Sequence, residues 1–302
     1  KEKNKNFFTA LEKNLNERIN YNHSKIDKKV KKIISDIILY GDDALFNFTK
    51  KYDNLDINSS NILLTKKILQ SYKKNIDPDI FKAFKVAIKN IKKFHVHQKP
   101  SDYSLFNKGV KTSMSWKPIN SVGLYIPGGK AVYPSSLIMN AVPAKIAGVK
   151  RIVVVTPTRP DLINPYLLAI LDELAISEVY CVGGAQAIAA LAYGTKSLKS
   201  VNKIFGPGNA YVASAKKQVY GKVGIDLIAG PSEIVVVADK YNNSKWVAAD
   251  LIAQAEHDEK AQSILITDDI NFAKKVQSNI KNLSSSLLKK DIIDKILNNF
   301  GI

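Results

Sequence analysis

The sequence predicts an α/β protein with parallel sheets, preceded by N-terminal helices. Between residues 122 and 267, short runs of apolar residues alternate with stretches of helical periodicity. Strands separated by helices pair in parallel through right-handed crossovers. Glycine-rich loops follow several of these strands, whereas the dinucleotide fingerprint G-x-G-x-x-G is absent. A chain of 302 residues accommodates one large or two medium domains around such sheets.

The N-terminal third has helical patterns. Apolar residues recur at helical spacing between residues 29 and 39, and Gly41-Asp-Asp43 ends that stretch before a second one begins. Asp77-Pro78 opens a long helix, because Asp caps a helix and Pro is tolerated at its first position. That helix ends near His95 and His97, which point apart on a helix and are therefore expected in core or surface roles.

The pattern then changes to alternation. Apolar and polar residues alternate from 110 to 116, which predicts a half-exposed strand pair. The elements predicted after it are strands at 122–126, 151–156, 179–182, 234–238 and 263–267, with helices at 134–147, 165–175, 185–193, 210–220 and from 244 to about 257. Val235, Val236 and Val237 show no alternation, so the strand that contains them is expected to be buried on both faces.

Charge and composition exclude several classes of protein. The net charge of +18 would attract the phosphate groups of a nucleic acid. However, the chain has only three arginines, and its lysines are spread over predicted helix faces. We therefore expect no specific nucleic-acid partner. No apolar stretch has the length of a membrane span and no signal-peptide core follows the charged start, so we expect no membrane partner and a cytoplasmic location. The single cysteine, Cys181, lies in an apolar context and is expected to be a packed, unreactive thiol.

Four loops after strands contain glycine, at residues 127–129, 183–186, 206–209 and 229–233. Ligands of parallel sheets bind outside the carboxyl ends of the strands, and glycine lets backbone N–H groups approach a ligand closely. Helix N-termini beyond such loops also favour phosphate. Together these loops favour a small-molecule site over turn chemistry alone.

The last predicted helix carries Gln254 and His257 at positions i and i+3, which places an amide and an imidazole on one face. Two interpretations are open at this point. The pair is half of a zinc site, or it belongs to the solvated end of an amphipathic helix with His257 near the negative helix terminus.

Five motifs in order resemble the histidinol dehydrogenase family. They are Val122-Gly-Leu-Tyr-Ile-Pro-Gly-Gly129, Val182-Gly-Gly-Ala-Gln-Ala-Ile-Ala-Ala190, Lys203-Ile-Phe-Gly-Pro-Gly-Asn209, Ala229-Gly-Pro-Ser-Glu233 and Gln254-Ala-Glu-His257. Gly41-Asp-Asp-Ala-Leu45 and Ile91-Lys-Lys-Phe-His-Val-His-Gln98 fit the same family. The resemblance implies two Rossmann-like parallel-sheet domains, with residues 125–233 inserted as a second domain between residues 1–124 and 234–302.

The resemblance also implies an activity and its site residues. The family oxidises L-histidinol to L-histidine through an aldehyde, with two NAD-dependent hydride transfers and one zinc ion, as a homodimer with shared sites. By position, Tyr125, Gln186 and Asn209 match NAD contacts, and Ser232 matches a substrate contact. Gln254 and His257 match zinc ligands that also hold the substrate, so the resemblance favours the zinc interpretation of that pair.

The chain departs from the family pattern at its end. It stops at Ile302, before the Pro-Glu-His motif with the family's acid/base pair and before the aspartate and histidine that complete the zinc site. We therefore expect no catalytic acid or base among these residues and no histidinol oxidation by this chain alone. The alternative function is that of a non-catalytic relic or fragment that binds NAD or a partner.

Overall fold

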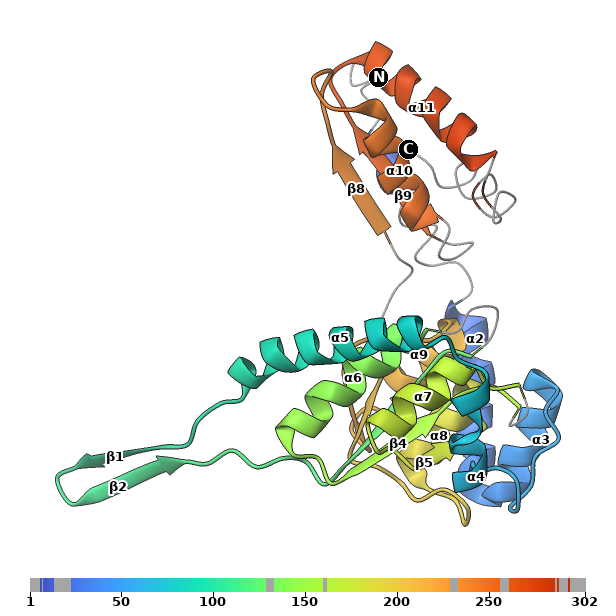
Figure 1. Ribbon diagram of the computed structural model, residues 1–302, viewed down its shortest axis with the longest axis vertical. Helices are drawn as coiled ribbons and strands as arrows, with labels where there is room; N and C mark the ends of the chain where they lie inside the picture. Colours follow the sequence, from blue (N-terminus) through green and yellow to red (C-terminus); the bar gives the residue numbers. More distant parts are fainter. Residues whose placement is uncertain are drawn as a thin grey trace. The chain divides into compact units, whose positions relative to one another are not determined.

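A computed structural model describes residues 6, 8–13, 23–128, 133–159, 162–228, 233–255, 261–285, 287 and 293 (Figure 1). The chain divides into two compact units, residues 1–229 and 230–302. The first unit carries N-terminal helices and a parallel sheet, and the second is a smaller α/β unit. The predicted α/β class with parallel pairing and N-terminal helices is confirmed.

Helices make up most of the chain before residue 100. They are α2 (His23–Tyr40), α3 (Asp42–Asp53), α4 (Lys66–Leu69), the 3₁₀ turn η1 (Ser71–Lys74), α5 (Pro78–His95) and the 3₁₀ turn η2 (Val96–Gln98). Gly41 separates α2 from α3 with φ of 56°, a conformation that glycine adopts without strain. Asp77 caps α5 as predicted, because its carboxylate accepts a hydrogen bond from the backbone N–H of Asp79 at 2.8 Å.

An antiparallel hairpin follows these helices. It pairs β1 (Tyr103–Asn107) with β2 (Val110–Met114), so the predicted strand pair is confirmed (Figure 1). All ten of its strand residues are exposed, including Leu105 and Phe106, whereas the alternating pattern had indicated one covered face.

The main sheet has five parallel strands in the order β5-β4-β3-β6-β7. The strands are β3 (Ser121–Tyr125), β4 (Arg151–Val155), β5 (Glu178–Tyr180), β6 (Lys203–Phe205) and β7 (Gly224–Ile225), and the helices between them are α6 (Pro134–Ala147), α7 (Pro165–Glu173), α8 (Gly184–Tyr193) and α9 (Ala210–Val219). The chain leaves β3 for β4 on one side and later returns to β3 on the other side with β6. Strand order therefore reverses between β3 and β6.

Alternate residues of each strand enter two different cores, as the period of two in a strand requires. On one face, Tyr125, Val153 and Val155 pack with α2, α3, α8 and α9. On the other face, Leu124 and Val154 pack with α4 to α7. Cys181 lies in the second core, where burial raises the pKa of its thiol to about 12, and the prediction of a packed cysteine is confirmed.

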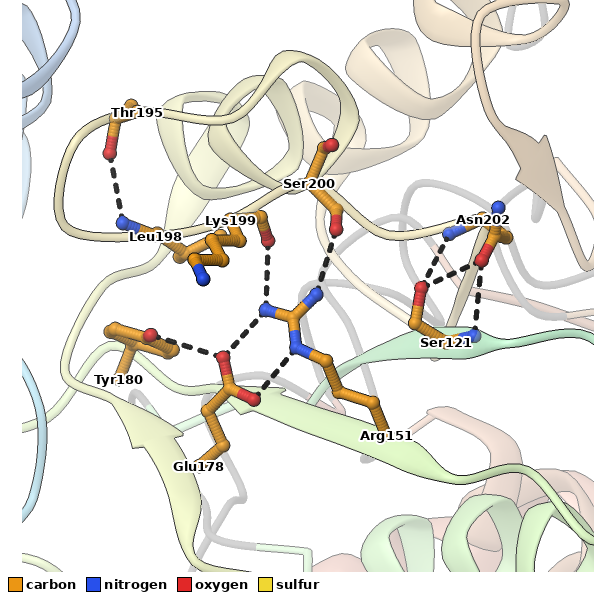
Figure 2. Close-up of polar contacts among 9 residues, drawn as sticks. All are labelled: Ser121, Arg151, Glu178, Tyr180, Thr195, Leu198, Lys199, Ser200 and Asn202. Carbon is orange, nitrogen blue, oxygen red and sulfur yellow. Dashed lines mark hydrogen bonds and ion pairs between the residues drawn. The ribbon is translucent and has the colours of Figure 1, made fainter.

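A polar network holds the amino-terminal ends of the strands together (Figure 2). Arg151, the first residue of β4, donates two hydrogen bonds to the Glu178 carboxylate of β5, at 2.8 and 2.6 Å. Its remaining N–H groups reach the backbone carbonyls of Ser200 and Lys199 at 2.8 and 2.9 Å. Such a fork uses the planar geometry that is specific to arginine. The network therefore ties the loop before β6 to the sheet, at the edge opposite the carboxyl ends.

The second unit has the order β8 (Glu233–Val237), α10 (Ser244–Ala255), β9 (Gln262–Ile266) and α11 (Ile270–Ser284), with β8 and β9 paired in parallel. The prediction that this strand is buried on both faces is wrong, because Val235 and Val237 are 53% and 76% exposed. The reason is that α10 and α11 pack against the side of β8 that carries Ile234 and Val236. The intervening valines lie on the opposite face.

The predicted domain division at residues 124/125 and 233/234 concerns the family fold and stays a prediction. Its first boundary falls at the last residue of β3, and its second lies close to the division between the two compact units. Among the described residues, no helix is both long and apolar enough to span a bilayer.

Candidate functional site

The carboxyl ends of β3 and β6 form the point where strand order reverses. A crevice opens there in parallel α/β sheets, because the connections on either side leave in opposite directions. Tyr125 ends β3, and the loop that contains Asn209 follows β6. The fold thus brings two of the predicted cofactor contacts to the reversal point, although 84 residues separate them in the sequence.

Tyr125 lies on the side of the sheet that faces α8. Its ring is 4% exposed, and its hydroxyl oxygen accepts a hydrogen bond from the backbone N–H of Gly184 at 3.2 Å. Burial raises the pKa of Tyr125 to about 12, so the hydroxyl keeps its proton and remains able to donate it to one further acceptor. Gly184 has φ of 63°, which suits glycine, and it is the first residue of α8.

Gln186 lies close to Gly184, the same glycine that donates to Tyr125. A Cβ at Gly184 would lie 2.6 Å from the Gln186 Oε1 atom, which shows how closely the amide folds over the start of the helix. The Gln186 Nε2 atom donates to the Asp53 carboxylate at 3.0 Å. The predicted pair Tyr125 and Gln186 therefore lies in one cluster with Asp53, which ends α3.

Asp53 is a site residue that sequence reasoning missed. Its carboxyl is half-buried, and desolvation raises its pKa to about 6, although the hydrogen bond from Gln186 acts in the opposite direction. No local signal distinguishes this aspartate from its neighbours, since it precedes Gln186 by 133 residues. Only the packing of α3 against α8 brings the two side chains together.

Asn209 holds the first turn of α9. Its side-chain oxygen accepts hydrogen bonds from the backbone N–H groups of Tyr211 and Val212, at 3.0 and 3.2 Å, and the residue is exposed. Its Oδ1 atom is thus engaged in capping, which leaves the amide N–H groups to face a ligand.

The loop before Asn209 is fixed by a buried ion pair. Lys216 pairs with Asp226 and also donates to the backbone carbonyl of Gly206 at 3.0 Å. Asp226 in turn accepts from the backbone N–H of Gly206 at 2.8 Å. Gly206 packs so closely on β3 that a Cβ there would lie 2.1 Å from the carbonyl oxygen of Tyr125. Lys216 and Asp226, neither of which we predicted, therefore set the distance between the Asn209 loop and the end of β3.

A pocket of about 430 Å³ opens beside Asp53, at the carboxyl ends of β3 and β4. Asp53 and Asn54 line one side, and Gly128 and Thr156, which follow the two strands, line another. Thr156 is fully buried, and in the described part of the chain its hydroxyl oxygen has no hydrogen-bond partner. The volume lies in the range of pockets that bind small molecules.

The structure describes only some of the residues that were predicted to bind zinc and substrate. Gln254 is the penultimate residue of α10 and is partly exposed, whereas His257 and Ser232 lie outside the described residues. Within the described ranges, no group of three or more His, Cys, Asp or Glu side chains is placed to hold a metal ion. Zinc requires three or four ligands, so the described residues do not by themselves make a zinc site. The Nδ1 atom of His95 forms a hydrogen bond with Oε1 of Gln98 at 2.6 Å, and His97 is exposed.

The reversal of strand order, the glycine loops and the polar cluster at the carboxyl edge define the doubly wound α/β class, in which such an edge receives dinucleotides. A sequence model of histidinol dehydrogenase matches residues 16–302. The chain belongs to the histidinol dehydrogenase family.

Individual relatives agree with this assignment. The chain is 47% identical over 277 residues to the histidinol dehydrogenase of Mesorhizobium japonicum, covering 91% of this chain and 64% of that protein. It is 44% identical over 279 residues to that of Lactococcus lactis, covering 92% and 65%. The crystal structure of histidinol dehydrogenase from Elizabethkingia anophelis superposes with a TM-score of 0.83 at 36% identity, covering 91% of this chain and 64% of that one. The chain thus spans about 64% of the length of these relatives.

Proposed function

We propose that the complete protein oxidises L-histidinol to L-histidine with NAD, and that this chain contributes the NAD site. The observation that supports the proposal is the cluster of Tyr125, Gln186 and Asp53 around Gly184, beside the Asn209 loop at the reversal point. NAD would supply the hydride acceptor, and the protein would supply binding and orientation.

The described residues fit a dinucleotide in three ways. Gly184 and Gly206 bring backbone close to the crevice, and α8 and α9 begin at the same edge, where the positive ends of the two helix dipoles favour pyrophosphate oxygens. The Tyr125 hydroxyl is protonated and the Asn209 amide retains free N–H groups, so both offer donors to a ligand. Gln186 is held in place by Asp53 rather than free to rotate.

We also propose that Gln254 and His257 bind zinc and that Ser232 contacts the substrate in the complete protein. Zinc would hold the amine and imidazole of histidinol and fix its carbinol carbon near the nicotinamide. Gln254 lies near the end of α10 and is partly exposed. A homodimer in the cytoplasm, with sites shared between subunits, belongs to the same proposal.

For the 302-residue chain by itself, we propose NAD binding without turnover. The family pattern matches two zinc ligands in this stretch and neither member of the acid/base pair. A positioned acid or base accelerates a reaction by roughly a hundred- to ten-thousand-fold, so chemistry without it and without a full zinc site would be too slow to detect. The second candidate function is NAD or partner binding without catalysis, and it is supported by the cluster of Tyr125, Gln186 and Asp53, which lies entirely within the described residues.

Calorimetric titration of NAD into the chain tests the cofactor site. Gln186→Ala and Asn209→Ala should weaken NAD binding about tenfold or more, in line with the loss of a hydrogen bond to a charged ligand. Asn209→Ala also removes a helix cap, so Asp269→Ala, which removes the cap of α11 in the other unit, is the matched control and should leave NAD affinity unchanged. Unchanged affinity in both cofactor variants would contradict the assignment.

Zinc and turnover are tested separately. His257→Ala in the complete protein should remove stoichiometric zinc and histidinol oxidation with an unchanged circular dichroism spectrum, whereas Ser232→Ala should mainly raise the KM for histidinol. The 302-residue chain should form no NADH from saturating histidinol, NAD and zinc. Turnover comparable to a complete relative would show that residues within the chain supply the base and the missing ligands, with His95 and His97 the first to replace.

A further inference from the structure

The pocket beside Asp53 contains polar groups that the NAD contacts predicted from the sequence do not include. Asp53 belongs to the end of α3, and Thr156 follows β4, so neither lies in the glycine loops that suggested a cofactor. The Asp53 carboxylate is nevertheless only 3.0 Å from Nε2 of Gln186. A ligand that contacts Gln186 therefore comes within reach of Asp53 and of the pocket that it lines.

The hydrogen-bonding capacity of the pocket is incompletely used. One oxygen of the Asp53 carboxylate accepts from Gln186, and no described residue donates to the other. The Thr156 hydroxyl is fully buried and has no hydrogen-bond partner among the described residues, and a Cβ at Gly128 would lie 2.6 Å from its oxygen. A buried hydroxyl is nearly always paired, and the half-buried Asp53 carboxylate can accept further hydrogen bonds, so these two groups suit a ligand that both donates and accepts hydrogen bonds.

The residues that line the pocket favour some classes of ligand over others. A carboxylate repels phosphate and accepts hydrogen bonds from hydroxyl groups, and acidic residues bind ribose hydroxyls in this way in dinucleotide-binding proteins. Leu55, Ile163 and Leu167 supply an apolar surface for the carbon skeleton of a sugar or for a base. Arg159, which also lines the pocket, suits the phosphate next to such a sugar. The volume of about 430 Å³ accommodates a nucleoside.

We propose that this pocket binds one ribose of the dinucleotide, with the Asp53 carboxylate accepting hydrogen bonds from its hydroxyl groups and the Thr156 hydroxyl completing the contact. The proposal rests on NAD being the cofactor and adds a second set of contacts to Tyr125, Gln186 and Asn209. Asp53 is then both a ligand contact and the group that positions the Gln186 amide.

Two conservative variants separate ligand binding from folding. Asp53→Asn keeps a side-chain oxygen that accepts from Gln186, but it removes the charge that a ribose diol prefers, so NAD affinity should fall about tenfold. Thr156→Val removes a hydroxyl that has no partner in the described structure, so it should raise the unfolding temperature while NAD affinity falls about threefold to tenfold. Asp56→Asn is the matched control, because Asp56 is an exposed carboxylate on the same segment that does not line this pocket, and it should bind NAD as the wild type does.

The experiment is calorimetric titration of NAD into the 302-residue wild type and these variants, with adenosine monophosphate and nicotinamide mononucleotide as competitors. Each competitor carries one ribose, so the one whose affinity falls in Asp53→Asn identifies the half of the dinucleotide that enters the pocket. Unchanged NAD affinity in both Asp53→Asn and Thr156→Val, with a loss in Gln186→Ala, would overturn the ribose pocket and leave the NAD site standing. An equal loss in Asp56→Asn would also overturn it, since the loss of affinity would then not depend on a residue that lines the pocket. No binding of NAD to the wild type would overturn the NAD site and the pocket together.

Discussion

Replacing Asp53 with asparagine is expected to stabilise the ligand-free chain at neutral pH and to leave its stability at pH 4 nearly unchanged. Desolvation raises the pKa of this carboxyl from its ordinary value of 3.8 to about 6, against the opposing effect of the Gln186 hydrogen bond. The folded state therefore holds the proton more tightly than the unfolded state between these two values. By linkage, folding stability falls as pH rises through this window and is lowest above it.

The size of the effect follows from the two pKa values. A rise from 3.8 to about 6 corresponds to about 3 kcal/mol of unfavourable ionisation at pH 7 and above. Because the carboxyl is only half-buried and solvent screens part of this cost, about 1 to 3 kcal/mol is the expected gain from Asp53→Asn. For a folded unit of roughly 200 residues, that gain raises the unfolding temperature by roughly 2 to 10 °C.

The assay is thermal and urea unfolding followed by circular dichroism, from pH 4 to pH 8, without cofactor. The wild type should lose stability between pH 4 and pH 7 relative to Asp53→Asn, and the two curves should converge near pH 4. Asp56→Asn serves as the control, since Asp56 is exposed and its partner Lys50 lies 3.5 Å away at the surface. The reasoning would be refuted if Asp53→Asn were no more stable than wild type at pH 7.5. It would also be refuted if the gain in stability over wild type were as large at pH 4 as at pH 7.5.

Three further outcomes are expected. Arg151→Lys should lower the free energy of unfolding by about 1 to 3 kcal/mol in urea, because lysine cannot reproduce the fork to Glu178, and NAD affinity should not change, since this network lies at the opposite edge of the sheet. Gly184→Ala should weaken NAD binding measured by calorimetry, since φ of 63° and a Cβ 2.6 Å from Gln186 Oε1 both force the cluster to shift; unchanged affinity would argue against the cluster as a cofactor site. Cys181 should react with a thiol reagent only on unfolding, because it is buried and the pKa of its thiol is about 12, and rapid modification of the native chain would contradict this.

The sequence by itself determined the alternation of strands and helices, most element positions to within a few residues, and the loops that carry Tyr125, Gln186 and Asn209. These are local properties, because periodicity, helix caps and glycine loops depend only on residues that are close together in the sequence. The short strands β6 and β7 were not among the predicted strand ranges, although the glycine loop at residues 206–209 was expected to follow a strand.

Only the tertiary structure decided which residues meet at the carboxyl edge. Asp53 reaches Gln186 because α3 packs on α8, and Lys216 with Asp226 holds the Gly206 loop against β3. The exposed face of β8 was also decided there, since a run of valines has the same pattern whether one face or two are covered. Such contacts join residues far apart in the chain, and their energies depend on burial and distance, which the order of residues alone does not contain.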